Sequence, residues 1–136
     1  MGYQLIVWEG RRPADDQAGQ RACLEMAERF LDGEQVEPTP GIREFVAALT
    51  EAWPDDPDDP EWECSPWVFP CLLDDASGPV LLVILTMDVA VLASTVVAAM
   101  AEARGLVTFD PQVALLRPVS EQVIAAYERR WAGALN

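Results

Sequence analysis

The longest apolar run of the chain, VLLVILTMDVAVLASTVVAAMA at residues 80–101, limits the folds open to it more than any other feature. The run is long enough to cross a bilayer as a helix. Asp88 lies near its centre, however, where a carboxylate costs about 2.5–3.5 kcal/mol in a membrane, and neither flank is basic. We therefore interpret the run as a buried strand followed by a buried helix, and we expect no membrane partner.

Turn residues and hydrophobic periodicity divide the rest of the chain into short elements. Residues 3–10 (YQLIVWEG) are rich in aromatic and branched side chains and predict a strand that is covered on both faces. Apolar spacing predicts helices over residues 15–32 and 39–53, and Thr39 followed by Pro40 is a typical helix start. The remaining predicted elements are a β-hairpin of residues 66–74 and 79–86 around DASG, a helix from Asp88 to Gly105 through Leu92, Val96, Ala99, Met100 and Ala103, a strand at residues 106–110, and a helix capped by Ser120.

These elements follow the order β-α-α-β-β-α-β-α, which indicates the α+β class. The core pattern βαββαβ predicts a ferredoxin-like sandwich, with one extra helix in the first crossover and another at the C-terminal end. At 136 residues the chain is expected to form a single domain over residues 1–136.

The absence of histidine and lysine from the sequence excludes several kinds of catalytic site. Without histidine, no Ser-His-Asp or Cys-His arrangement and no His-containing zinc site can form. Without lysine, the chain cannot form a Schiff base or supply a P-loop lysine. We therefore expect no cofactor, and the composition favours a protein that acts by binding.

The net charge of −14 and the cysteine pattern indicate the compartment and the kind of partner. So negative a surface is repelled by nucleic-acid backbones and by anionic membranes, so that neither is expected as a partner. The first ten residues have no pattern of a secretory signal, and the odd, irregularly spaced cysteines suit a reduced cytoplasm. No metal site is expected, because no CxxC pair occurs among the three cysteines, Cys23, Cys64 and Cys71.

An acidic, proline-rich segment at residues 54–66, here called the acidic loop, is the first predicted binding site. Proline stiffens the segment and keeps it out of a helix. In one interpretation its tryptophans fold back onto the core; in the other they are exposed anchors inside an acidic rim that binds a basic protein. On the second interpretation the partner-binding residues are Asp55, Asp56, Asp58, Asp59, Glu61, Trp62, Glu63 and Trp67.

The motif FDPQ at residues 109–112 is the second predicted site. Asp110 before Pro111 ends a strand and turns the chain, and Gln112 is placed to satisfy backbone groups there. Asp110 and Gln112 could also line a binding site at the strand end. The structural role is the favoured interpretation, because no other polar residue converges there in sequence.

Four segments of the chain stand out together: YQLIVWEG (3–10), PTPGIREFVAALTEAWP (38–54), SPW (65–67) with SGP (77–79), and GLVTFDPQ (105–112). They resemble a family of small, largely uncharacterised bacterial proteins that is common in actinobacteria. The family opens with a YxLxVWEG-like strand and carries GLVxYDPQ near its C-terminus, where this chain has Phe109 in place of the usual tyrosine. The resemblance implies a cytoplasmic stand-alone domain, with members that look like immunity proteins of toxin–immunity systems.

Three functional hypotheses follow. The leading one is a non-enzymatic immunity protein that occludes the active site of a basic toxin. The second is a small hydrolase or lyase that uses carboxylates, with or without a divalent metal. The third is a regulatory or oligomerising module, such as a homodimer that pairs through its sheet edges.

Overall fold

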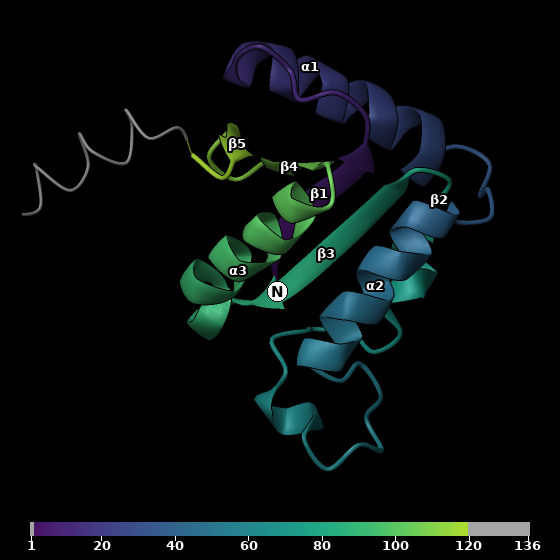
Figure 1. Cartoon of the computed structure of the whole chain (residues 1–136), viewed down its shortest axis with the longest axis vertical. Helices are drawn as coiled ribbons and strands as arrows, with labels where there is room; N and C mark the ends of the chain where they lie inside the picture. Colours follow the sequence, from purple (N-terminus) through teal and green to yellow (C-terminus); the bar gives the residue numbers. More distant parts are fainter. Residues whose placement is uncertain (1, 120–136) are drawn as a thin grey trace, which may run out of the picture.

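Strand β1 (Gly2–Glu9) lies at the centre of an antiparallel sheet in the computed structural model, which describes residues 2–119. It pairs on one side with β3 (Val80–Thr86) and on the other with β4 (Leu106–Asp110). The edge strands are β2 (Ala76–Ser77) and β5 (Leu115–Arg117), so the strand order is β2-β3-β1-β4-β5 (Figure 1). The α+β class is confirmed. The five-stranded order differs from the four-stranded ferredoxin-like sheet that the sequence predicts.

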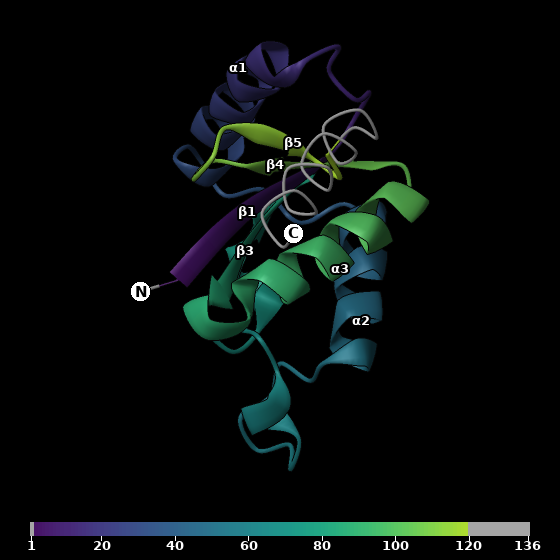
Figure 2. The same cartoon turned by 90° about the vertical axis from the view of Figure 1, so that its left-hand side faces the viewer.

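The alternation of side chains along β1 builds two hydrophobic cores, one on each face of the sheet. Leu5 and Val7 pack with α2 (Pro40–Ala52) and α3 (Ala90–Ala103) on one face. Ile6 and Trp8 pack on the other face with α1 (Asp16–Met26) and the π-helical turn that follows it, Ala27–Leu31. The sheet therefore lies between α1 on one side and α2 and α3 on the other (Figure 2).

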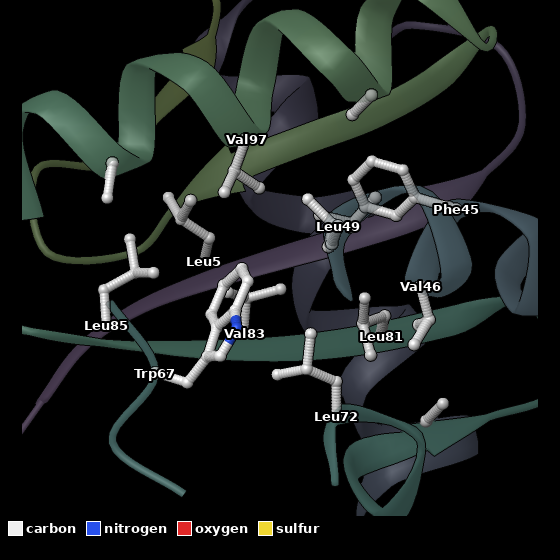
Figure 3. Packing of buried hydrophobic residues seen from close by; sticks show 14 of the residues in the cluster. Leu5, Phe45, Val46, Leu49, Trp67, Leu72, Leu81, Val83, Leu85 and Val97 are labelled. Atoms are coloured by element: carbon white, nitrogen blue, oxygen red, sulfur yellow. The ribbon is translucent and has the colours of Figure 1, made fainter. Parts of the chain in front are cut away.

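Helix α2 agrees closely with its sequence signals. The Thr39 hydroxyl accepts a hydrogen bond from the Ile42 N–H at 3.3 Å, and Pro40 occupies the first helical position. The helix ends before Trp53 and Pro54, as its sequence predicts. Its buried residues, several of which Figure 3 shows against the sheet, are Ile42, Phe45, Val46 and Leu49.

Helix α3 begins and ends close to the predicted positions, but its predicted apolar line is not the buried face. Leu92 is 72% exposed, and its neighbour Val91 is 86% exposed. Because the helix is apolar all round, its sequence reveals that it is a helix but not which face meets the sheet. The buried face consists mostly of small side chains, which let the helix approach the strands closely: Ala90, Ala93, Ser94, Val97, Ala98 and Ala101.

The predicted hairpin of residues 66–74 with 79–86 is wrong in its first strand. Residues Leu72–Asp75 form a 3₁₀ helix, and Trp67 forms only an isolated bridge to Leu85 of β3. The short strand β2 takes the predicted place instead, and its turn contains Gly78 with a positive φ of 54°. Pro66 and Pro70 lack an N–H, so this stretch cannot form a continuous ladder with β3.

Two further sequence predictions concern a membrane-spanning helix and the C-terminal helix. Among the described residues, no helix combines the length and apolar character that crossing a bilayer requires. The helix expected from Ser120 lies outside the described residues.

The buried face of α3 generates a test with a matched control. Ala101 is fully buried, so Ala101→Leu overpacks the helix–sheet contact and should lower the free energy of unfolding by about 1–3 kcal/mol. Ala99 is exposed on the same helix, so Ala99→Leu should change stability by less than about 0.5 kcal/mol. Urea denaturation measures both; equal losses would show that the helix is rotated relative to this structure.

Candidate functional site

The acidic loop follows α2 and lies at one end of the molecule (Figure 1). Four of its predicted binding residues have exposed side chains: Asp56, Asp58, Glu61 and Glu63. The other two acids, Asp55 and Asp59, are half-buried. Most of the loop acids thus face solvent.

Backbone hydrogen bonds give this loop a defined shape. The Asp55 carboxylate accepts a hydrogen bond from the Leu72 N–H at 2.9 Å, and the Asp55 carbonyl accepts one from the Cys71 N–H at 3.0 Å. The Asp59 carboxylate accepts from the Glu61 N–H at 2.9 Å, as in an Asx turn. Asp55 and Asp59 therefore position the chain, and so does Asp56, whose carboxylate accepts a hydrogen bond from the Asp58 N–H at 2.9 Å. The carboxylates of Asp56, Asp58, Glu61 and Glu63 remain exposed to a partner.

The tryptophans hold the loop onto the core. Trp67 is only 3% exposed and lies among the core residues in Figure 3. Its indole N–H donates to the Trp53 carbonyl at 2.9 Å, and the two rings meet edge to face with centroids 5.8 Å apart. Trp62 is half-buried and packs against the same core. The predicted partner-binding role of Trp67 is therefore corrected: its ring is an anchor and does not face solvent.

The region around the loop carries negative charge without compensation. Residues 44–103 contain twelve acidic residues and no basic one. The ion pairs among the described residues, Arg43–Glu37 and Arg117–Asp110, involve none of the loop carboxylates. Burial and then the charge of Asp74 raise the pKa of Asp75, which lies next to the loop anchor at Leu72.

Desolvation, and then the negative charges of Asp74, Asp55 and Asp56, raise the pKa of the Cys71 thiol. A raised thiol pKa disfavours the thiolate, which is the form that attacks electrophiles and binds metals. No group of three or more His, Cys, Asp or Glu residues in the described part of the chain is arranged to hold a metal ion.

The second predicted site, at the end of β4, is a buried polar cluster. Asp110 is fully buried, and its carboxylate oxygen Oδ2 accepts a hydrogen bond from the Tyr3 hydroxyl and lies 3.4 Å from the Arg117 guanidinium. Arg117 also donates to the Thr95 hydroxyl of α3 at 3.2 Å. The cluster thus links β1, β4, β5 and α3, and its Arg117 compensates the buried charge of Asp110.

The Gln112 side chain forms hydrogen bonds to the backbone of β1 at Gln4, beyond the point where β4 ends. In the register of β1 with β4, Ile6 pairs with Phe109, so Gln4 faces Pro111, which has no N–H to donate. The Gln112 side-chain amide replaces the missing partner, because it donates to the Gln4 carbonyl at 2.7 Å and accepts from the Gln4 N–H at 2.6 Å. It also donates to Asp110 Oδ1 at 2.7 Å. The favoured structural interpretation of DPQ agrees with this geometry.

Sequence reasoning missed Tyr3 and Arg117 as members of this cluster. Tyr3 alternates with Leu5 and Val7 and so belongs to the buried face of β1, a signal that was present in the sequence. Arg117 lies in β5, a strand of three residues between Ala114 with a positive φ of 55° and Pro118, and so short a strand has no detectable periodicity.

Burial raises the pKa of Tyr3 to about 12, with the hydrogen bond to Asp110 as the next cause. A phenol with this pKa stays protonated at neutral pH and acts as a hydrogen-bond donor rather than as a base. Together with the ion pair between Asp110 and Arg117, this hydrogen bond connects neighbouring strands and gives the cluster a structural role. The exposed acidic loop is therefore the better candidate for a functional surface.

Comparison with known proteins adds no relative: no family model, no curated protein and no solved structure matches the chain. The resemblance to the family with the YxLxVWEG start therefore stays a prediction.

The Trp67 anchor can be tested through its hydrogen bond. Trp67→Phe keeps an aromatic ring but leaves the Trp53 carbonyl without its donor, so the free energy of unfolding should fall by about 1–3 kcal/mol. Trp62→Phe serves as the control, because Trp62 is half-buried and packs at the margin of the core. Urea denaturation of both variants measures the difference; a larger loss at Trp62 would contradict the anchoring role of Trp67.

The Tyr3 hydrogen bond predicts a particular pH dependence. The pKa of Tyr3 is about 12 in the folded protein and about 10 in an unfolded chain. The neutral phenol therefore stabilises the fold fully below about pH 10, and this contribution is lost as the pH rises toward 12. Phenolate absorbance of a Tyr127→Phe variant isolates the Tyr3 titration. A Tyr3 midpoint near 10 in the folded protein would refute the buried hydrogen bond.

Proposed function

We propose that this chain is a non-enzymatic acidic binding protein, and specifically an immunity protein that neutralises a basic toxin by occluding its active site. The observation that carries the proposal is the acidic loop, with four exposed carboxylates on a stretch of sixty residues, 44–103, that has no basic side chain. A basic protein surface is the partner that such a field attracts.

The way the loop is held favours binding as well. Hydrogen bonds to Asp55 and Asp59 and the anchoring of Trp67 order the loop before any partner arrives. A preordered loop loses less conformational entropy on binding than a flexible one, so that more of the interaction energy is available as affinity. Carboxylates around the contact also accelerate the encounter with a basic partner.

The finer fold assignment belongs to the same proposal. Strands β2-β3-β1-β4 with α2 and α3 on one face are the part of the structure that supports a ferredoxin-like βαββαβ core. On this view, α1 is the extra helix of the first crossover and β5 is an added edge strand. A cytoplasmic location is proposed too, on the support of three free cysteines, Cys23, Cys64 and Cys71.

The proposal predicts a charge-dependent complex. The loop variant Asp56→Asn, Asp58→Asn, Glu61→Gln and Glu63→Gln removes four exposed charges without touching Asp55 or Asp59. Co-expression and pull-down with a basic toxin domain from a neighbouring gene tests whether a complex forms. In stopped-flow mixing of the two purified proteins, this variant should associate at least about tenfold more slowly than the unaltered protein, because electrostatic steering is lost. Raising the salt concentration should slow the unaltered protein in the same direction.

A matched control removes the same charge outside residues 44–103: Glu25→Gln, Glu28→Gln, Asp32→Asn and Glu34→Gln, all at exposed positions. This variant should keep nearly the full association rate. If the unaltered protein forms no complex with the toxin domain and gives cells no protection, the proposed function is wrong. If both variants slow association equally, net charge matters and the acidic loop does not.

A further inference from the structure

The start of α3 carries an apolar surface that the fold does not use. Met87 and Val89 in the 3₁₀ turn before the helix, and Val91 and Leu92 in its first turn, are 62%, 42%, 86% and 72% exposed. These four residues are here called the α3 patch. A contiguous apolar surface of this kind on a soluble domain commonly marks a site of interaction.

The patch has the shape of a helix-docking surface. Val91, Leu92 and Thr95 lie on α3, and Asp88 belongs to the 3₁₀ turn directly before it. Together with Val89 these residues line a shallow groove of about 420 Å³. A second helix that lays its apolar side into such a groove is a common mode of peptide recognition.

The α3 patch lies at the same end of the molecule as the acidic loop. The Thr86 N–H donates to the Pro66 carbonyl at 2.8 Å, and the Val68 N–H donates to the Ile84 carbonyl at 3.0 Å. The chain leaving the loop therefore runs beside the end of β3, directly before Met87. Figures 1 and 2 both show the first turn of α3 on the side from which the loop extends.

The charges around the patch define what its occupant must carry. Asp88 lies within the groove and is exposed, and the patch belongs to the stretch of residues 44–103 that has no basic side chain. Arg117, which donates to the groove residue Thr95, is already paired with the buried Asp110. An occupant with an apolar face and flanking positive charges would satisfy both features, whereas a second copy of this chain would bring its own negative surface to the same place.

We propose that the α3 patch binds a cationic amphipathic helix of a protein partner, with the apolar side of that helix in the groove and its basic side chains toward Asp88 and the acidic loop. The inference rests on the proposed function and deepens it, because it names the element by which a basic partner is recognised. The loop supplies attraction at long range, and the patch supplies the apolar contact.

The test uses the full chain and a fluorescent synthetic peptide of leucine and lysine, patterned so that leucine covers one face of a helix. Fluorescence anisotropy should show binding that weakens at least about tenfold with Val91→Gln plus Leu92→Gln. The matched control is Leu24→Gln plus Val36→Gln, at apolar positions 63% and 47% exposed on other parts of the molecule, and it should bind like the unaltered protein. Asp88 is left unchanged, because a carboxylate at a helix start also stabilises the helix.

Each outcome separates this inference from the proposed function. No binding of the peptide, or an equal loss in both double variants, overturns the inference. Concentration-dependent dimers in light scattering that vanish in the Val91 and Leu92 variant overturn it too, in favour of a second copy on the patch. If the toxin-domain complex forms and is insensitive to the patch variant, the proposed function stands and this inference fails. If the peptide binds through the patch while no toxin complex forms, the inference stands and the proposed function fails.

Discussion

The double burial of β1 is the constraint on which the rest of the structure depends. This strand is paired along both edges, and its residues Leu5, Ile6, Val7 and Trp8 are all at most 8% exposed. A strand covered on both faces requires helices on both sides, which is why α1 and the pair α2 and α3 lie on opposite faces of the sheet. The polar groups at its N-terminal end need partners as well: Asp110 accepts from the Tyr3 hydroxyl, and the Gln112 amide bonds the Gln4 backbone.

The same core supports the surface that we propose to be functional. Trp67 is part of the core and directly follows the acidic loop, so the energy that stabilises the fold also orders the loop. Exposed carboxylates then stand on a chain whose shape is already defined. The α3 patch lies next to it for a related reason: the helix uses small side chains toward the sheet, so its larger apolar residues remain outside. An acidic rim beside an apolar groove is a surface suited to a basic amphipathic partner.

Sequence reasoning succeeded where a signal is local. Thr39 with Pro40 located the start of α2, and Gly105 with the apolar run located the end of α3. It failed where the outcome depends on distant residues. The stretch of residues 66–74 has strand-like composition but cannot pair continuously with β3, and β5 exists only because Arg117 and its neighbours pair with β4. At the candidate sites, the geometry of Asp110 and Gln112 agrees with the structural role that the sequence favours. The burial of Trp67 agrees with the interpretation that folds the tryptophans back onto the core, and it contradicts a partner-binding role for this ring.

The sequence by itself determined the α+β class, the residue types open to chemistry and the concentration of negative charge in one region, because composition, period and capping are properties of neighbouring residues. Only the tertiary structure decided which face of α3 is buried, which tryptophan is an anchor, and that the acidic loop and the α3 patch share one end of the molecule. These outcomes depend on how strands pair and helices pack across large separations in sequence. Propensity along the chain contains no information about that geometry.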